Sequence, residues 1–385
     1  MMRLVIIGIR KTGTSLALVN AALSRGIDVT IISNPEDRID GVFSSCVVIK
    51  YMISDVSFII NWIKENYPTP QSTLRITTLN DVYACITAQV SSALNLPGPD
   101  VFCVSRAVSK HQQKKILVAK KIPTPEFREF NLSNIEKKEA MLGQLEFPIV
   151  IKPSEGTASN GVKRCTLYSE VFSHLDFLAD QKKLRPDLVP SDIVLLEKYL
   201  PGTEYCVEYF DGNYVGAIRK SKRFGNDFFE RGYTSELDMD EKALRNLIET
   251  GSRAVEAAGL NWGPVHIDCI VNDGLAGIIE LNPRIAGSFI CDIIHDAYSF
   301  DMVDHLLNKL QEKDVTVPVK FLPDAYACVI FFLESDPLPW KFAESGELKN
   351  DIIHITYGPQ HLRNRSRRAY VYIRNLMRNK QLEND

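Results

Sequence analysis

Two apolar segments late in the chain carry polar side chains whose spacing could bind a metal ion. In IIELNPRIAG, Glu280 and Asn282 are two residues apart, so they lie on one face if the segment is a strand. In the preceding GPVHIDCIV, His266 and Asp268 alternate in the same way. A hairpin through the turn NDG would bring both carboxylates and the amide together, with Arg284 just beyond. Such oxygen ligands suit Mg²⁺, with phosphate and water completing its coordination; the alternative is an acidic edge facing only solvent.

A lysine followed by a loop of small residues is the second feature that could do chemistry. In FPIVIKPSEGTASNGVKRC, a short strand leads to Lys152, and the loop 154–161 separates it from a second strand. Backbone N–H groups of such a loop can cover phosphate, although a plain flexible loop has the same composition. The lysine at its foot favours the phosphate interpretation, because an ammonium group is what a polyphosphate needs.

The start of the chain predicts a parallel sheet. Residues 3–33 read as strand, glycine turn, amphipathic helix and strand, which is one βαβ unit. Gly8 and Gly13 are spaced as in a phosphate-binding loop, but Thr14 replaces the required lysine and Arg10 breaks the dinucleotide pattern. We therefore interpret the glycines as a strand-to-helix turn. A further strand and helix, ended by a Pro/Gly stop, close this region near residue 104.

The elements that follow predict two further regions. A helix over 105–121 ends at IPTPEF, and the Lys152 hairpin comes after it. The segment 192–224 reads as a strand to Glu197, a bend, and alternating strands from Glu204. An amphipathic helix over 240–260 precedes the acidic hairpin.

Composition limits the classes of protein that fit. Lys plus Arg (45) nearly balance Asp plus Glu (48), and the net charge is -3, so no field along the whole chain favours nucleic acid. Eight cysteines without a C-x-x-C pair indicate reduced, buried thiols, and the first residues resemble a strand and not a signal peptide or membrane span. We expect a cytoplasmic protein with no nucleic-acid or membrane partner, and a homodimer as the default oligomer.

Taken in order, these motifs resemble the ATP-grasp superfamily of ATP-dependent carboxylate ligases, and within it the L-amino acid ligase branch. The resemblance implies an α/β fold that is α+β in its ATP-binding part. It divides the chain into a Rossmann-like parallel-sheet domain (1–104), a small mobile lid with a linking helix (105–195), and an antiparallel catalytic domain with a basic tail (196–385).

The resemblance also implies roles for individual residues. Lys110 and Lys152 would bind the nucleotide phosphates, and the loop after Lys152 would cover them. Glu197 would accept the adenine amino group, backbone groups of Tyr199 and Leu200 would contact the base edge, and Glu204 would hold the ribose hydroxyls. The cofactor-binding residues implied are Lys110, Lys152, Ser154, Glu155, Gly156, Ser159, Gly161, Glu197, Tyr199, Leu200 and Glu204.

Metal and catalytic roles follow from the same motifs. Asp268, Glu280 and Asn282 would hold Mg²⁺, with Mn²⁺ as an alternative ion, and Arg284 would face the acyl phosphate. The catalytic residues implied are Arg284, Lys152, Glu280 and Asn282. Two positions depart from the family pattern: Ser109 stands where an acid usually precedes the first lysine, and Asp268 stands where Glu is commoner.

The implied activity joins an amino acid or small carboxylic acid to an amine or a second amino acid, as in dipeptide synthesis, through an acyl phosphate. A carboxylase, a thioester-forming ligase and a non-catalytic ATP-binding regulator are the alternatives. Weaker candidates for substrate contact are His266, Lys220, Arg223, Arg284 and Gly287. The loop 225–236 could shape the amine pocket, and the basic tail from residue 363 is expected to form a strand and helix with a solvated face.

Overall fold

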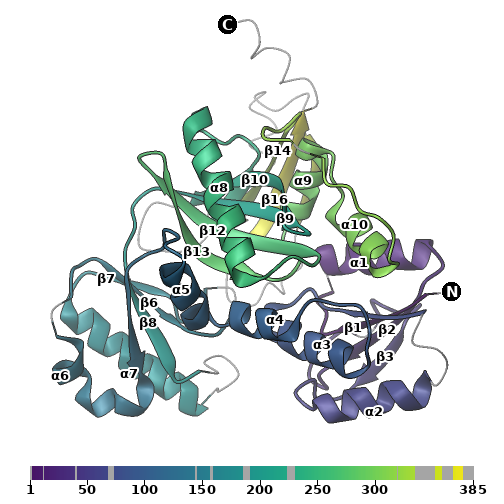
Figure 1. Ribbon diagram of the computed structural model, residues 1–385, viewed down its shortest axis with the longest axis horizontal. Helices are drawn as coiled ribbons and strands as arrows, with labels where there is room; N and C mark the ends of the chain where they lie inside the picture. The colour runs from purple at the N-terminus through teal and green to yellow at the C-terminus, as the bar shows by residue number, and fades with distance from the viewer. Residues whose placement is uncertain are drawn as a thin grey trace, which may run out of the picture.

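The computed structural model of the chain describes residues 2–11, 13–39, 41–67, 73–143, 145–156, 159–184, 191–222, 230–318, 320–333, 352–357 and 367–375. Three sheets organise it, and Figure 1 shows them in separate parts of the molecule, with α4 (Val101–Val108) and α5 (Lys110–Ala119) running between the two smaller ones.

The first sheet is parallel, in the order β3-β2-β1-β4. Its elements are β1 (Arg3–Ile7), α1 (Thr14–Ser24), β2 (Asp28–Ser33), β3 (Val47–Lys50), α2 (Val56–Asn66), β4 (Leu74–Thr77) and α3 (Asp81–Ala93). The predicted βαβ unit is confirmed. Gly8 has φ 67°, and a Cβ there would overlap the ring of Tyr83, so the glycine serves close packing at the turn.

The second sheet is a small antiparallel one, in the order β5-β8-β6-β7. Its elements are β5 (Phe127–Asn131), η2 (Leu132–Lys137), α6 (Lys138–Leu142), β6 (Ile149–Pro153), β7 (Lys163–Cys165), α7 (Tyr168–Leu184) and β8 (Ile193–Lys198). Ile151, Leu175 and Val194 are fully buried between the sheet and α7. The predicted hairpin around the loop that follows Lys152 is confirmed by the pairing of β6 with β7.

The third sheet has eight strands, in the order β13-β12-β9-β10-β11-β14-β16-β15. These are β9 (Thr203–Phe210), β10 (Asn213–Lys222), β11 (Glu230–Thr234), β12 (Pro264–Asn272), β13 (Leu275–Asn282), β14 (Tyr326–Leu333), β15 (Ile352–Tyr357) and β16 (Arg367–Asn375). Alternation along β9 divides two hydrophobic cores: Val207 and Tyr209 join the core that contains α8 residues, while Cys206 and Phe210 join the core that contains α9 residues. The helices are α8 (Glu241–Ala258), α9 (Ile290–Tyr298) and α10 (Met302–Leu310).

Two expectations about segments need correction or restriction. Residues 230–234, expected within a loop, form β11 between β10 and β14. The basic tail contributes β16, as expected for its strand, whereas the helix expected after it lies outside the described residues.

All eight cysteines are free, but only five are buried, and Cys46, Cys85 and Cys103 are half-exposed. Among the described residues, no helix combines the length and apolar character needed to cross a membrane.

Candidate active site

The acidic hairpin has the register that the alternation predicts. Asp268 on β12 lies opposite Glu280 on β13, and His266 lies opposite Asn282. A bulge follows Asp268, and the turn at Asp273 and Gly274 joins the strands. The two carboxylates and the amide therefore share one face of the large sheet.

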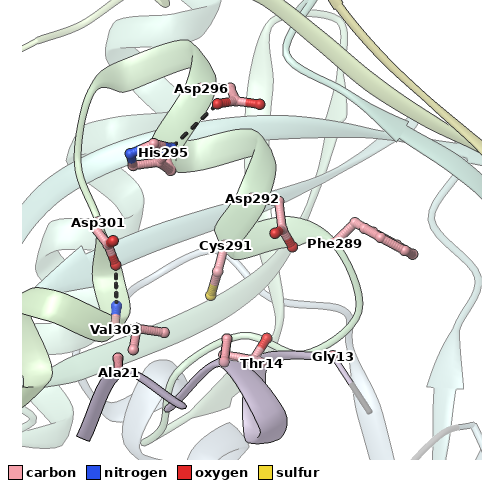
Figure 2. A pocket seen from close by; sticks show the side chains of 11 residues that line it. Gly13, Thr14, Ala21, Phe289, Cys291, Asp292, His295, Asp296, Asp301 and Val303 are labelled. Carbon is pink, nitrogen blue, oxygen red and sulfur yellow. Dashed lines mark hydrogen bonds and ion pairs between the residues drawn. The ribbon is translucent and has the colours of Figure 1, made fainter. Parts of the chain in front are cut away.

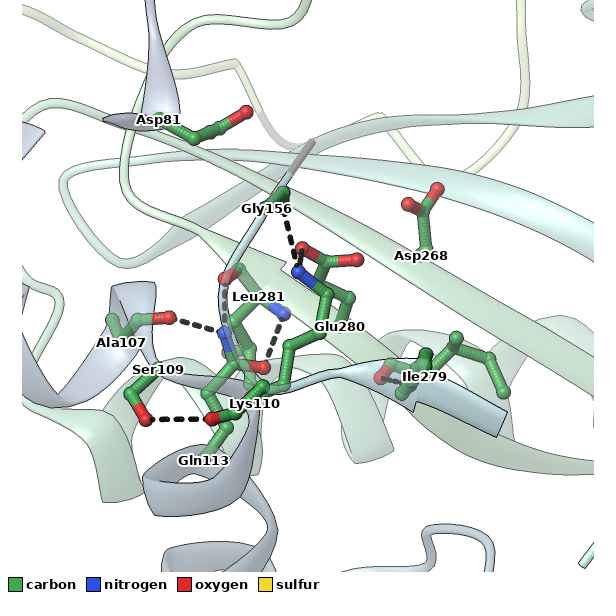
Figure 3. A network of polar contacts seen from close by, with 12 residues as sticks. Asp81, Ala107, Ser109, Lys110, Gln113, Gly156, Asp268, Ile279, Glu280 and Leu281 are labelled. Atoms are coloured by element: carbon green, nitrogen blue, oxygen red, sulfur yellow. Dashed lines mark hydrogen bonds and ion pairs between the residues drawn. The ribbon is translucent and has the colours of Figure 1, made fainter. Parts of the chain in front are cut away.

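Lys110 connects this hairpin to the loop after β6. Its Nζ lies 2.9 Å from Glu280 Oε1 and donates to the carbonyl of Gly156 at 2.9 Å, as Figure 3 shows. Ser109 caps α5, because its hydroxyl accepts from the N–H of Gln112 at 3.5 Å. The serine that replaces the usual acid thus begins the helix that carries the lysine.

Gln113 fixes α5 against the same hairpin, which the sequence did not indicate. Its Nε2 donates to the carbonyl of Leu281 at 2.7 Å, and its Oε1 accepts from the N–H of Leu281 at 2.9 Å. Because both bonds are buried, they set where Lys110 stands relative to Glu280.

Asp268 is surrounded by donors that approach one of its oxygens. Lys220 Nζ lies 2.5 Å from Oδ1, His266 Nε2 lies 3.5 Å from it, and the thiol of Cys206 donates to it at 3.7 Å. Burial acts to raise the pKa of Asp268, but Lys220 and His266 outweigh it and hold the pKa well below its ordinary value. The carboxylate is therefore ionised.

The oxygen set fits a hard cation. Asp268 and Glu280 side chains keep 22% and 23% exposure, and the nearest protein cations approach Oδ1 and Oε1, so the other oxygen of each can face a ligand. Cys206, His266 and Asp268 also lie within 4.8 Å of one another. That set is a poor match for Mg²⁺, because burial raises the pKa of the Cys206 thiol and Glu208 already holds His266.

Glu197 sits at the end of β8 with two lysines on the same oxygen. Lys152 Nζ lies 2.9 Å and Lys114 Nζ 3.3 Å from Glu197 Oε1. All three side chains are at most 5% exposed. Lys114 was not among the residues singled out in the sequence; burial lowers its pKa to about 7, against the opposing effect of Glu197.

The loop after Lys152 is only partly described, since residues 157 and 158 lie outside the described set. Ser154 is buried, and its carbonyl accepts from the N–H of Lys110 at 2.9 Å. Glu155 and Gly156 are half-buried. Ser159 and Gly161 have φ 53° and 71°, so both take the left-handed conformation near the second strand of the hairpin. Ser154 therefore anchors α5 at the start of the loop.

The segment after β8 holds the other residues expected at a nucleotide base. The N–H of Tyr199 donates to the carbonyl of Pro148 at 3.0 Å, and the Arg164 guanidinium lies 4.1 Å from the Tyr199 ring centre. Leu200 follows directly, and Glu204 pairs in register with Ile270 on β12. These residues border the Glu197 end of the site.

Arg284 forms an ion pair with Asp81, the first residue of α3. Its Nη2 donates to Asp81 Oδ2 at 2.7 Å, its Nε bonds Oδ1, and its Nη1 donates to the carbonyl of Ile285 at 2.9 Å. The sequence did not indicate Asp81, because the two residues lie 203 positions apart. The parallel-sheet region thus holds a guanidinium that was expected to face the acyl phosphate.

The weaker substrate candidates lie in different surroundings. His266 is buried, and its Nδ1 lies 2.6 Å from the fully buried Glu208; burial would lower its pKa, but Glu208 and Asp268 raise it to about 10. Lys220 forms an ion pair with Asp268, as described above. Gly287 has open space where a Cβ would stand. Arg223 lies outside the described residues.

A separate cavity lies between α1 and the helices α9 and α10 (Figure 2). Thr14 and Cys291 line it, and both donate to the carbonyl of Ala286. Asp292 also lines it, and burial raises the pKa of that carboxyl to about 6. The cavity shares no lining residue with the nucleotide and metal candidates, and Gly13 at its edge needs no nucleotide to explain it.

Comparison with solved structures places the architecture in a known class. The L-amino acid ligase from Bacillus licheniformis superposes with a TM-score of 0.81 at 18% identity, over 100% of this chain and 96% of that one. The fold is the ATP-grasp fold. Residues 145–292 match the model of the ATP-grasp domain, as the motifs of the sequence predicted.

Curated relatives match this chain over part of its length. The alanine–anticapsin ligase of Bacillus amyloliquefaciens is 24% identical over 72% of this chain and 62% of its own length. The D-alanine–D-alanine ligase of Gloeobacter violaceus is 30% identical over 49% of this chain and 63% of its own length. The chain therefore spans less than two thirds of the curated relatives that it matches, and in one case 47%.

Proposed function

We propose that the protein is an ATP-dependent carboxylate–amine ligase, which forms an amide bond through an acyl phosphate and releases ADP and phosphate. The observation that carries the proposal is the pairing of Asp268 with Glu280 across β12 and β13, beside Lys110. Nucleotide binding alone does not require two adjacent carboxylates, an amide and an arginine, whereas phosphoryl transfer to a carboxylate does.

The chemical difficulty is that a carboxylate does not react with an amine. Phosphorylation replaces a poor leaving group with phosphate, so the amine can attack the acyl carbon. Lys110 and Lys152 would neutralise phosphate oxygens, and Asp268, Glu280 and Asn282 would hold Mg²⁺. When bound, that ion supplies charge stabilisation to the transferring phosphoryl group. The two lysines and the three metal ligands hold the reactants in line, which is most of what phosphoryl transfer needs from a protein.

Arg284 has a role in the second step. Its guanidinium stabilises the oxyanion that forms when the amine attacks, and loss of one such donor typically costs about 100-fold to 1,000-fold in rate. Asp81, which belongs to the parallel-sheet region, orients the guanidinium of Arg284. Closure of the loop 154–161 excludes water, which otherwise hydrolyses an acyl phosphate.

The substrate class follows from the relatives' names. Alanine–anticapsin ligase, D-alanine–D-alanine ligase and L-amino acid ligase all name amino acids, so we assign an amino acid or small carboxylic acid and an amine to this site. We also propose that the chain consists of three regions with boundaries near residues 104 and 195. We further propose that the protein is cytoplasmic and forms a homodimer.

Product analysis tests the proposal. Purified protein with ATP and Mg²⁺ is supplied with pooled amino acids and small carboxylic acids, and the released nucleotide is identified. ADP that appears only with both an acid and an amine supports ligation. ADP formed with bicarbonate in place of the acid indicates the carboxylase alternative, and ADP formed with a thiol in place of the amine indicates the thioester alternative. AMP refutes the acyl phosphate. Tight ATP binding with no product from any pool favours a regulatory nucleotide site.

A further inference from the structure

Three buried side chains at the end of β8 form an unequal set: two lysines and one glutamate. Both ammonium groups approach Glu197 Oε1, Lys152 at 2.9 Å and Lys114 at 3.3 Å. A single carboxylate balances one charge, so a second ammonium beside it is costly unless the set has another use. ATP supplies that use in the proposed function, on which the following inference depends.

The two lysines differ in how firmly they are held. Among the residues that the structure describes, Lys152 has one other hydrogen bond, a long one of 3.5 Å to the carbonyl of Ile279 on the strand that carries Glu280. Lys114 is bound on two more sides: it donates to Thr124 Oγ1 at 2.6 Å and to the carbonyl of Ile278 at 3.4 Å. Thr124 is itself fixed, because its hydroxyl donates to that carbonyl at 2.8 Å. Lys152 is therefore the lysine that can move.

Movement of Lys152 to a phosphate would leave Glu197 buried without its nearest cation. Glu197 is 3% exposed, and an unpaired carboxylate at that depth would take up a proton or turn away. Lys114, with 1% exposure, stays beside it. Glu197 then remains ionised. Both lysines lie closest to its Oε1, so its Oε2 can accept a hydrogen bond.

We propose that Lys114 is a positioning residue for nucleotide binding: it holds Glu197 ionised and oriented toward the exocyclic amino group of adenine while Lys152 engages the phosphates. The inference concerns base selection. A purine with a carbonyl at the same position would place oxygen against a carboxylate, which repels it. ATP is thus preferred over ITP, and the preference depends on a lysine that touches neither nucleotide.

The surroundings of Lys114 agree with this role. Its low pKa, caused by burial, shows that the protein holds the ammonium at a cost, and Glu197 and Glu280 both act to keep it charged. Added phosphate charge near the site favours the charged form further. ATP binding and protonation of Lys114 are therefore expected to support each other.

Equilibrium binding of ATP and of ITP, each with Mg²⁺, tests the inference in the full chain. The variant is Lys114→Met, which keeps the length of the side chain and removes the charge. The control is Lys115→Met, because Lys115 is the next residue on α5, is 52% exposed and pairs with Glu129. Lys114→Met should weaken ATP binding about 10-fold to 100-fold, the usual cost of a lost charged hydrogen bond, while ITP binding changes little. Lys115→Met should match wild type for both.

The outcomes separate this inference from the proposed function. If wild type binds ATP and Lys114→Met keeps the same ATP-to-ITP ratio, the inference is wrong and the ligase proposal stands. If wild type binds neither nucleotide, both fall. Equal weakening for ATP and ITP would make Lys114 a merely structural residue and overturn the inference. Should Lys114→Met not fold, as judged by circular dichroism, Lys114→Gln is measured and interpreted in the same way.

Discussion

Three carboxylates in the site share one arrangement at the scale of single residues. Glu197, Asp268 and Glu280 each receive their nearest lysine on one oxygen. The lysines offset part of the cost of burying the charge, and the second oxygen can serve a ligand. In each case the protein holds one carboxylate oxygen in place and leaves the other oxygen for a ligand. A metal–nucleotide complex could bind to such oxygens.

Glu280→Gln tests the metal assignment. The amide keeps the shape but loses the charge that attracts Mg²⁺ and faces Lys110. We expect product formation to fall about 100-fold or more, with an unchanged circular dichroism spectrum. Titration with Mn²⁺ in the presence of ATP should show weaker metal binding in parallel. Turnover near the wild-type rate would contradict a metal role for this carboxylate.

Lys114→Met should also change how stability depends on pH. Burial lowers the folded-state pKa of Lys114 from 10.5 to about 7, so between these values the unfolded chain binds a proton that the folded chain lacks. The contribution of Lys114 to the free energy of unfolding therefore rises with pH between about 7 and 10.5, and this contribution is lowest below pH 7. Methionine does not titrate. Urea unfolding should find the variant relatively more stable at pH 6.5, with its advantage shrinking by pH 9.5.

A difference that stays constant with pH would contradict the lowered pKa of the buried Lys114. The His266 group, whose pKa is raised to about 10, titrates in the same range. It is present in both proteins, so it cancels in the comparison. Lys115→Met again serves as the exposed control, and its difference from wild type should not vary with pH.

The sequence predicted contacts between side chains when the alternation of nearby residues determines which residues pair. Asp268 and Glu280 were placed together because alternation and one turn determine their pairing. Lys114, Glu208 and Asp81 were missed. Each depends on a residue at least 58 positions away, and nothing near them in the sequence marks such a partner.

At the scale of elements, hairpins were predictable and non-local pairing was not. The β6–β7 and β12–β13 hairpins carry their turn residues with them. By contrast, β11 forms from a segment that reads as a loop, and it pairs with β10 on one side and with β14, far along the chain, on the other. Gly232 lies in β11 where a Cβ would overlap the carbonyl of Val329, so a residue typical of loops here permits close strand approach.

Gly216→Ala and Gly287→Ala form a matched pair of glycine substitutions. A Cβ at Gly216 would lie 2.8 Å from Ile294 and from the Tyr298 ring, where α9 packs on β10. Overpacking of this kind costs about 1–3 kcal/mol, so the thermal midpoint should fall by several degrees. Gly287 has open space, so its substitution should change stability by less than about 0.5 kcal/mol.

The informative comparison is the kinetic one. If Gly287 faces substrate, Gly287→Ala should raise the KM for the acid or amine although it leaves the fold intact. Gly216→Ala should leave KM unchanged at temperatures where it is folded. A Gly287→Ala protein with wild-type kinetics would remove Gly287 from the substrate candidates.

At the scale of the whole molecule, specific polar contacts attach the parallel-sheet region to α10 and to the segment that follows β13. Thr14 donates to the carbonyl of Ala286 at 3.1 Å, and Arg75 donates to that of Leu310 at 2.5 Å. Arg25 bonds Asp304 and donates to Asn308 at 3.0 Å. The sequence predicted the fold of each part but not this docking, since it depends on polar pairs between residues more than 200 positions apart, such as Thr14 with Ala286.

Asp81→Asn and Arg25→Gln distinguish the two consequences of that docking. Both remove a carboxylate–guanidinium pair between the parallel-sheet region and the rest, but only Asp81 touches a residue assigned to catalysis. Asp81→Asn should lower turnover about 10-fold to 100-fold, because Arg284 loses its fixed orientation, while ATP affinity measured by calorimetry stays within about 2-fold. Arg25→Gln should lower the thermal midpoint by a few degrees at most, with turnover unchanged. Equal losses of turnover in both variants would mean that docking as a whole, and not the orientation of Arg284, supports catalysis.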